Sequence, residues 1–249
     1  MKLPFGNGKP LLKWITDSIK SSEIVDKCIV ATSVNTENDQ IEEFCNKNNF
    51  QCFRGSEEDV LSRFITITKN EEADVVIRLT GDNPILDIGI LDQVINEHLD
   101  SDSDYTASLG LPLGMNFEVI SGQAFLSISE EATQAEKEHV TLYFKNRDEF
   151  IKQSVSLSED EELNKLRVTV DYPEDFLVVS HLFSSLKKDE LPSFSLVKRI
   201  FDETPWVFRV NSGEIQKRAF SDFSDEKKEA VQLLRKYGFK KSANKLENA

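Results

Sequence analysis

Apolar residues occur along this chain in two alternating patterns, short continuous runs and longer stretches with apolar residues three and four positions apart. The short runs predict buried strands and the longer stretches predict helices. Because the two patterns alternate, the sequence predicts an α/β fold, a mostly parallel sheet with helices on both faces. The expected strands are 27–32, 50–53, 73–77, 105–108, 117–120 and 166–170. The expected helices are 10–21, 38–48, 88–99 and 136–146, with another that begins near Val60.

The pattern changes after about residue 186. We expect a short helix at 192–203, a strand at 206–210 and an amphipathic helix at 225–237 that stops at Gly238. The polar residues beyond Gly238 predict a disordered tail. The sequence therefore predicts two domains, an α/β domain over 1–186 and a C-terminal extension over 187–249.

The segment Arg-Leu-Thr-Gly-Asp-Asn-Pro-Ile-Leu-Asp at 78–87 follows one predicted strand and precedes a predicted helix. Asp82 therefore lies just beyond the carboxyl end of a parallel strand, where open α/β sheets bind ligands. A carboxylate in such a turn is suited to hold Mg²⁺ against the phosphates of a nucleotide. The alternative is structural, with Asp82 in an Asx-turn and Asp87 as a helix cap.

Asp171 is the second candidate, because it ends the predicted strand 166–170 and precedes Pro173, a favoured first helical residue. Asp171 and Glu174 have the spacing of a capping box, which is a structural interpretation. A second carboxylate at another strand end also suits a shared Mg²⁺ site.

Composition limits the classes of protein to which this chain can belong. The chain has 249 residues, of which 39% are hydrophobic and 30% charged, as in a globular protein. Its net charge of −14, with no basic segment, excludes nucleic acid as an expected partner. Because no apolar run is long enough to span a membrane and the first residues do not open a signal peptide, we expect a cytoplasmic protein.

Cysteine and histidine spacing indicates no metal centre. Cys28, Cys45 and Cys52 form no CxxC pair, and Cys28 and Cys52 fall in strand-like runs as small core residues. His98, His139 and His181 are too dispersed for a zinc site.

The segment 78–87 resembles the central motif of the cytidylyltransferases typified by the spore-coat polysaccharide synthesis protein, relatives of the sialic-acid and KDO cytidylyltransferases. The resemblance covers roughly residues 3–215. Further matching segments follow in the family's order at 8–12, 29–33, 53–56, 59–63, 118–119, 138–141 and 170–175.

The resemblance implies a Rossmann-like nucleotide-diphospho-sugar transferase fold and a specific reaction. A sugar hydroxyl would attack the α-phosphate of CTP, and a CMP-sugar for glycan synthesis would form as pyrophosphate leaves. Such a transfer depends on in-line positioning and charge neutralisation. Asp82 and Asp171 would hold Mg²⁺.

The resemblance also assigns the remaining site residues. The nucleotide would contact Lys9, Thr32, Ser33 and Arg78, and the acceptor sugar would contact Arg54, Glu118 and His139. At residue 116, Asn stands where relatives more often have Asp, which leaves the acceptor open. A homodimer is expected through the apolar, turn-rich segment 109–113.

The sequence departs from the family's pattern at its amino end. The family opens with a hydrophobic strand and a phosphate-binding loop, whereas this sequence corresponds to the family only from the residues after that loop. We therefore expect an in-frame segment upstream of Met1, and little or no activity without it. Two alternatives stay open: a non-catalytic paralogue that binds sugar or nucleotide only, and a glycosyltransferase of similar fold. The glycosyltransferase alternative would use Asp102-Ser103-Asp104, which has the Asp-x-Asp form but precedes a strand.

Overall fold

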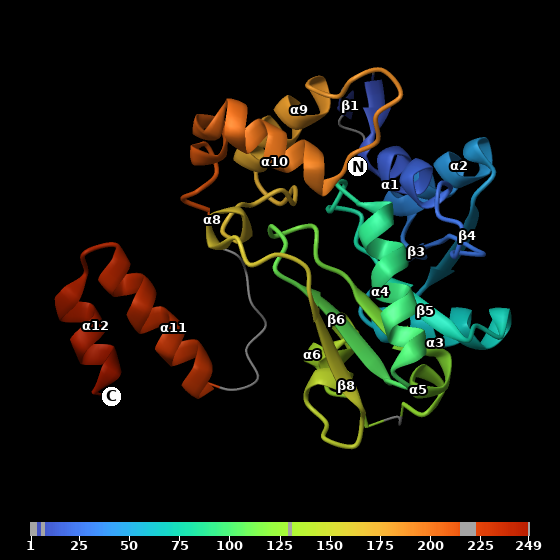
Figure 1. Ribbon diagram of the computed structural model, residues 1–249. Helices are drawn as coiled ribbons and strands as arrows, with labels where there is room; N and C mark the ends of the chain where they lie inside the picture. The colour runs from blue at the N-terminus through green and yellow to red at the C-terminus, as the bar shows by residue number, and fades with distance from the viewer. Residues whose placement is uncertain (1–3, 6–7, 129–130, 215–222, 249) are drawn as a thin grey trace. The chain divides into compact units, whose positions relative to one another are not determined.

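The computed structural model describes residues 4–5, 8–128, 131–214 and 223–248. By its internal contacts the chain divides into two compact units, Met1–Glu214 and Ile215–Ala249. The first unit contains the described strands and is a mixed α/β structure, which confirms the predicted fold class (Figure 1).

The strands of the first unit form a hairpin and two sheets. β1 (Pro4–Phe5) and β2 (Lys9–Pro10) form the antiparallel hairpin, and β3 (Ile29–Ser33) pairs in parallel with β4 (Gln51–Gly55). The larger sheet has the order β5–β7–β6–β8, in which β7 runs antiparallel to β5 and β6, and β6 runs parallel to β8. Its strands are β5 (Val75–Arg78), β6 (Tyr105–Leu109), β7 (Glu118–Ser121) and β8 (Lys152–Ser156).

Helices follow most strands, as the sequence predicts. The first unit contains α1 (Leu11–Ile19), α2 (Asp39–Asn48), α3 (Val60–Glu71), α4 (Ile88–Asp100), α5 (Gly122–Leu126), α6 (Gln134–Glu138), α7 (Leu142–Lys145), α8 (Glu161–Asn164), α9 (Pro173–Ser184) and α10 (Phe194–Glu203). Two 3₁₀ turns, η2 (Thr36–Asn38) and η3 (Pro205–Arg209), lie beside α2 and α10. The second unit contains α11 (Phe223–Lys236) and α12 (Lys240–Glu247).

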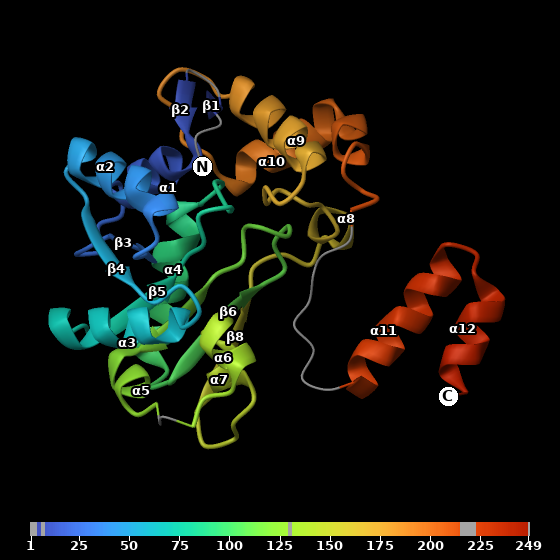
Figure 2. The same cartoon turned by 180° about the vertical axis from the view of Figure 1, so that it is seen from behind.

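Side-chain alternation along β7 explains how the larger sheet is covered. Val119 packs with Leu91 and Val94 of α4 on one face. Ile120 points to the opposite face, where it packs with Leu61 of α3 and other apolar side chains from α5 to α7. Figures 1 and 2 show α4 on one side of the sheet and α3, α5 and α6 on the other. The period-two pattern of a strand therefore buries both faces of this sheet.

A further core joins the strand ends to the last helices of the first unit. Val168 lies in it with Val178 and Val179 of α9 and Leu196 of α10, all of them without solvent exposure. Trp14 of α1 belongs to the same core, with its ring centroid 4.8 Å from that of Phe183. In the first unit, α10 thus packs with α9 behind the carboxyl ends of the strands.

The structure corrects two of the predicted strands. Residues 166–170 are bonded through one isolated parallel bridge, Leu113 to Arg167, because their neighbours on either side are loop segments rather than a strand. Residues 206–209 of the expected strand 206–210 fall in η3, since Pro205 starts a tight turn and the buried residues Val207 and Phe208 are consecutive instead of alternating.

Other predicted elements differ as well. The helix expected at 136–146 is split by His139, which has non-helical backbone angles. The tail expected to be disordered forms α12, whose Ala243 is fully buried in the second unit. β8 was not predicted, because only Val155 of its five residues is buried and apolar.

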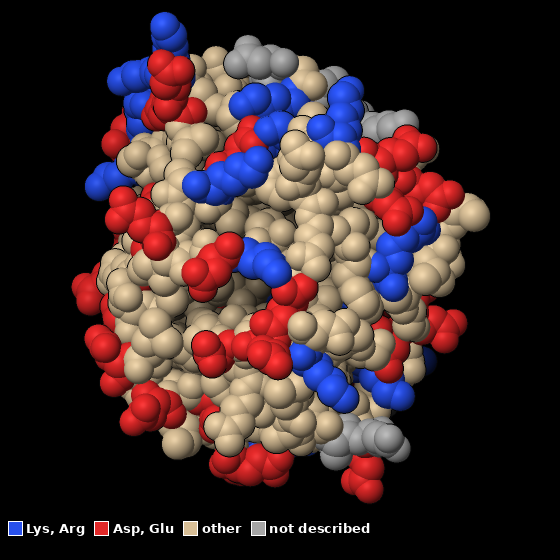
Figure 3. All heavy atoms as spheres, turned by 90° about the vertical axis from the view of Figure 1, so that its right-hand side faces the viewer, with Lys and Arg blue, Asp and Glu red and all other residues tan. Residues whose placement is uncertain are grey.

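Charged and apolar side chains on the surface determine which partners the protein can bind. Figure 3 shows acidic and basic side chains interspersed over one face, which is hollowed near its middle. Within the segment expected to be an exposed dimer contact, Leu111 and Pro112 are buried in the chain's own core, and Leu109 is exposed. Among the described residues, no helix has both the length and the apolar character needed to cross a membrane.

Candidate active site

Asp82 lies in the loop that leaves β5, held from two sides. The Thr80 hydroxyl donates a hydrogen bond to its side-chain Oδ1. Its backbone carbonyl accepts a hydrogen bond of 2.9 Å from the Val170 N–H and a longer one of 3.5 Å from the Thr169 hydroxyl. The two predicted strand-end segments, 78–87 and 166–171, therefore lie side by side although they are far apart in sequence.

Asp171 lies next in the chain to that contact, and its carboxylate is oriented by Arg167. The Arg167 Nη2 donates a 2.6 Å hydrogen bond to the Asp171 Oδ2. Burial and the negative charge of Asp82 raise the pKa of Asp171 above its ordinary value, against the pull of Arg167. The Asp82 carboxylate is thus close enough to Asp171 for its charge to disfavour ionisation of Asp171.

The capping interpretation of Asp171 and Glu174 is wrong, because Asp175 caps α9 instead. The Asp175 Oδ2 accepts hydrogen bonds of 3.0 Å from the N–H groups of both Asp171 and Tyr172. The Asp171 side chain is therefore not occupied at the helix start.

A buried ion pair anchors this helix start. Arg167 and Asp175, with side chains 6% and 0% exposed, form a bidentate pair with distances of 2.7 and 2.9 Å. Asn211 adds a hydrogen bond of 2.8 Å to the Asp175 Oδ1. Burial alone would raise the pKa of Asp175, but Arg167 and the other donors outweigh it and hold that pKa below its usual value.

Asp87 caps a helix, which is the structural alternative that the sequence offered for it. Its Oδ1 accepts a hydrogen bond of 3.2 Å from the Ile90 N–H at the start of α4. Its Oδ2 accepts one of 2.9 Å from the Phe194 N–H at the start of α10. One carboxylate therefore links two helix starts beside the site.

The donor set of Asp82 and Asp171 fits Mg²⁺. In the described part of the chain no group of three or more His, Cys, Asp or Glu side chains could hold a metal by itself. Mg²⁺ takes few carboxylates and completes its shell with water and substrate phosphates, so two adjacent carboxylates suffice. Burial and the charge of Asp82 both raise the pKa of Asp171, and a divalent cation between the two carboxylates would offset that repulsion.

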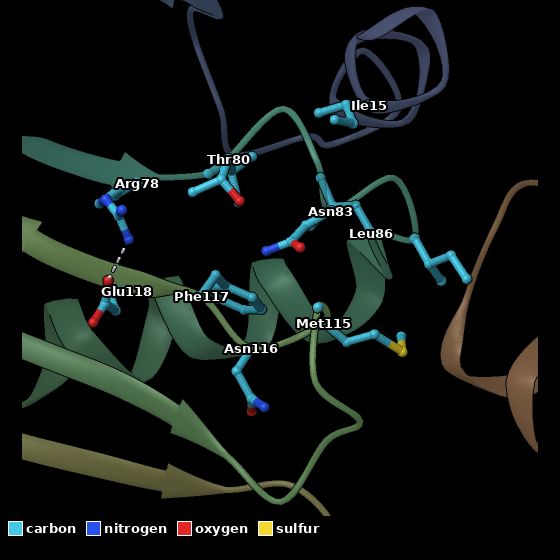
Figure 4. A pocket seen from close by; sticks show the side chains of 12 residues that line it. Ile15, Arg78, Thr80, Asn83, Leu86, Met115, Asn116, Phe117 and Glu118 are labelled. Carbon is cyan, nitrogen blue, oxygen red and sulfur yellow. Dashed lines mark hydrogen bonds and ion pairs between the residues drawn. The ribbon is translucent and has the colours of Figure 1, made fainter. Parts of the chain in front are cut away.

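A small pocket of about 40 Å³ lies at the end of β5, between the 78–87 loop and the residues before β7. Figure 4 shows Thr80 and Asn83 on one wall and Phe117 and Asn116 on another. Arg78 and Glu118 face each other across adjacent strands at its edge, with 3.2 Å between the Arg78 Nη1 and the Glu118 Oε2. Asn116 donates a hydrogen bond of 2.9 Å to the Leu111 carbonyl.

Glu118 is the centre of a polar cluster at this edge. Its side chain is 13% exposed, and Lys145 approaches the Oε1 at 2.5 Å while the Tyr105 hydroxyl donates to the same oxygen at 2.8 Å. Burial alone would raise the pKa of Glu118, but Lys145, Arg78 and Tyr105 together outweigh it and hold that pKa low. Glu118 is therefore an ionised carboxylate shared by two cations, Arg78 and Lys145.

The residues expected to contact the nucleotide lie at β3 and before α1. Thr32 and Ser33 end β3 and are both buried, and the Ser33 hydroxyl accepts a 2.7 Å hydrogen bond from the Asn38 amide. The Lys9 ammonium is 3.4 Å from Asp17 and 4.4 Å from the Trp14 ring centroid.

Arg54 lies beside Ser33 at the end of β3, and His139 lies at the end of α6. The Arg54 guanidinium makes four hydrogen bonds within the protein, to Asp39, Glu42 and the carbonyls of Ser33 and Asn35. His139 is half-buried at the end of α6, where its N–H bonds the Ala135 carbonyl at 2.8 Å.

The Asp-x-Asp segment and the cysteines, which were considered from the sequence as possible sites, lie in structural positions. Asp102 lies in a left-handed turn with φ of 50°, and the Asp104 carboxylate accepts a 2.8 Å hydrogen bond from the Ile151 N–H, so the Asp-x-Asp segment forms a turn. Burial raises the pKa of Cys28 to about 11 and that of Cys45 to about 12, so these thiols stay protonated near neutrality.

An α/β unit with carboxylates at the carboxyl ends of its strands is the arrangement of nucleotide-binding α/β proteins. Comparison with known families makes the class specific. The cytidylyltransferase family model matches residues 3–236, and the chain belongs to this family of nucleotidyltransferases.

Individual proteins agree with this family assignment. The chain is 38% identical over 173 residues to the spore coat polysaccharide biosynthesis protein SpsF of Bacillus subtilis, covering 68% of this chain and 71% of that protein. It is 32% identical over 213 residues to the uncharacterized protein MJ1063 of Methanocaldococcus jannaschii, covering 83% and 86%. A solved cytidylyltransferase from Leptospira borgpetersenii has the same fold, with a TM-score of 0.76, 24% identity and coverage of 87% and 91%.

The structure also contains site residues that sequence reasoning missed. Arg167 and Asn211 orient the carboxylates of the 171–175 segment, and Lys145 and Tyr105 bind Glu118. The only sequence signal for Arg167 was a basic residue inside the apolar run 166–170, where burial demands a charged partner.

Proposed function

We propose that this protein transfers the cytidylyl group of CTP to a sugar hydroxyl, forming a CMP-sugar for polysaccharide synthesis. The observation that carries the proposal is the adjacency of Asp82 and Asp171, brought together by the backbone bond between Val170 and Asp82. Membership in the cytidylyltransferase family and similarity to a spore coat polysaccharide protein support the choice of CTP and of a sugar acceptor.

In this proposal Asp82 and Asp171 would hold Mg²⁺, and the bound ion would neutralise charge on the phosphates. Thr80 orients the Asp82 carboxylate, and Arg167 orients that of Asp171. The acceptor would lie toward Glu118 and His139, and the nucleotide toward Arg78 and the end of β3. CTP as substrate is consistent with the cytoplasmic location expected from sequence.

Charge-neutral substitution of Asp82 tests the proposal. In a form of the protein with measurable wild-type turnover, Asp82→Asn should lower Mg²⁺-dependent release of pyrophosphate from CTP by about 100-fold or more, because one of two metal-binding carboxylates is lost. Asp102→Asn is the matched control, since it makes the same charge change in a turn away from the site.

The assay needs a panel of sugar acids as acceptors and tryptophan fluorescence to verify folding. Undiminished turnover in Asp82→Asn would refute the assignment of the metal ligands. Equal loss in Asp102→Asn would show that overall charge, rather than the site, controls the rate.

A further inference from the structure

The second unit differs in charge from the rest of the chain. Its described helices, residues 223–248, contain seven Lys and Arg against four Asp and Glu, whereas the whole chain contains 30 against 44. Five of these seven cations lie within 235–246, where no carboxylate occurs. The expectation from sequence that no segment is basic is therefore wrong for this part of the chain.

The basic residues surround a tight turn between two helices. α11 ends at Lys236 and α12 begins at Lys240, and Gly238 between them has a φ of 82°. The Phe239 N–H closes the turn with a 2.7 Å hydrogen bond to the Leu234 carbonyl. Figures 1 and 2 show the two helices joined as a hairpin. The turn is therefore the tip of a helical hairpin, and it brings both halves of the basic segment to one end.

Two aromatic side chains at this tip are exposed to solvent. Tyr237 is 51% exposed and Phe239 is 60% exposed. The hairpin has a small core of its own, in which Val231 and Ala243 are the buried apolar residues among those described. Leu246, two turns along α12 from Phe239 and on the same face, is half-buried. Within the described residues of this unit, Phe239 is therefore left largely uncovered.

The cations beside these aromatic side chains are exposed as well. Lys236, Lys240 and Lys241 lie at the surface and form no ion pair with any other described residue. Arg235, by contrast, is paired at 2.6 Å with Glu247. Within the described part of the unit, the tip therefore presents three positive charges that no carboxylate balances.

We propose that this hairpin tip, residues 235–241, docks the protein on the surface of an anionic lipid bilayer. Tyr237 and Phe239 enter the boundary between headgroups and acyl chains, where aromatic rings are removed from water. Lys236, Lys240 and Lys241 contact the lipid phosphates, which supply the negative charge that the tip lacks. The contact is peripheral, so it requires no membrane-spanning helix, and it does not depend on the proposed activity.

Aliphatic side chains near the tip favour a bilayer over a nucleic acid. Cations with aromatic rings also suit single-stranded nucleic acid, whose bases stack on the rings. The tip, however, adjoins Leu234, which is half-buried and whose carbonyl bonds the Phe239 N–H, and Leu246 continues the same apolar face of α12. Aliphatic side chains gain nothing from base stacking, whereas acyl chains cover aliphatic and aromatic groups alike. The mixed surface therefore fits lipid.

Sedimentation with lipid vesicles tests the docking in the full 249-residue chain. At about 0.1 M NaCl, vesicles of phosphatidylcholine with about 30% phosphatidylglycerol should bind the protein about tenfold or more tightly than vesicles of phosphatidylcholine alone. Raising NaCl to about 0.5 M should weaken the binding, because screening shortens the reach of the lysine charges.

Two variants separate the lysine charges from the aromatic ring, and far-UV circular dichroism verifies that each keeps its helices. The triple variant Lys236→Gln, Lys240→Gln and Lys241→Gln should bind phosphatidylglycerol vesicles about tenfold or more weakly. Phe239→Ser should weaken binding about tenfold at both salt concentrations, because salt does not screen an apolar contact. The matched control makes the same charge change at three exposed lysines of the first unit, Lys47, Lys69 and Lys188.

Equal binding to the two kinds of vesicle, or binding to neither, would overturn the proposal. A triple variant that binds as tightly as the wild type, or a control that loses as much binding as the triple variant, would do the same. Tighter binding of an oligothymidylate strand than of phosphatidylglycerol vesicles would assign the tip to nucleic acid instead. Because no measurement includes CTP or a metal ion, failure here is separate from failure of the proposed nucleotidyl transfer.

Discussion

Replacing Arg167 with Met tests the buried ion pair that orients the Asp171 segment. The substitution keeps an unbranched side chain of similar length and removes the guanidinium. It leaves the Asp175 carboxylate, 0% exposed, without its bidentate partner. Breaking a buried pair in this way costs about 3–5 kcal/mol, because the remaining charge stays buried.

Three hydrogen bonds to Asp175 survive the substitution, and they set the expected magnitude. The donors are Asn211 at 2.8 Å and the N–H groups of Asp171 and Tyr172, each at 3.0 Å. We therefore expect the lower end of the range, about 3 kcal/mol. For a unit of this size such a loss lowers the melting temperature by roughly 6–12 °C.

Urea denaturation followed by tryptophan fluorescence measures this loss. The protein has two tryptophans, and both Trp14 and Trp206 lie in the first unit, so the signal reports that unit. The midpoint should fall with an unchanged m-value. Lys165→Met is the control, since it breaks an exposed pair with Glu162 and should leave the midpoint where it is.

The pH dependence sharpens the test. The pKa of Asp175 is depressed in the folded protein, so its contribution is present above the unfolded value of 3.8 and is lost as pH falls through the folded pKa. Without Arg167 that pKa rises, so the difference between wild type and Arg167→Met should shrink at acid pH. A loss below about 1 kcal/mol near neutrality, the size of an exposed pair, would refute the buried-pair reasoning.

Two further predictions concern a histidine and the nucleotide. His98 is 3% exposed with Nδ1 2.8 Å from the Thr106 hydroxyl, and burial lowers its pKa below 6.5. The unfolded chain therefore takes up a proton that the folded protein resists, and stability should fall as pH drops from about 6.5 toward the lowered pKa. His98→Gln should reduce this pH dependence of stability, measured as urea midpoints at a series of pH values. An unchanged pH dependence would mean that a group other than His98 causes it. CTP binding to the protein by calorimetry should weaken about tenfold or more when EDTA removes divalent ions, and equal affinity would exclude the Asp82–Asp171 metal site.

The fold class was predictable because the alternation of buried side chains along a strand or helix is a local property of the sequence. Val119 and Ile120 alternate between two cores, and this period-two pattern is visible in the sequence. The strand expected at 166–170 failed for a nonlocal reason. Its apolar composition reflects burial against α9 and α10, whereas ladder formation requires a neighbouring strand that the described structure does not place there.

The candidate site was predictable only in part. Chain direction was enough to single out Asp82, which follows β5. Asp171 was chosen as the end of a strand that the structure replaces with one bridge, although its segment does lie beside that of Asp82. The partners of Asp175 and Glu118 were not predictable, because Asn211 reaches Asp175 across 36 positions and Lys145 reaches Glu118 from a separate helix. Side-chain pairs of this kind depend on how helices pack, and single-sequence patterns carry no information on that packing.

The paired cations around the site explain why a metal ion is central to the proposed reaction. Arg78 is paired with Glu118, Arg167 with Asp171 and Asp175, and Lys9 with Asp17. In a protein of net charge −14, these cations are already balanced by carboxylates. A triphosphate would therefore meet little uncompensated positive charge along the described edge. In the proposed reaction, the neutralising charge would come from a divalent ion held by Asp82 and Asp171.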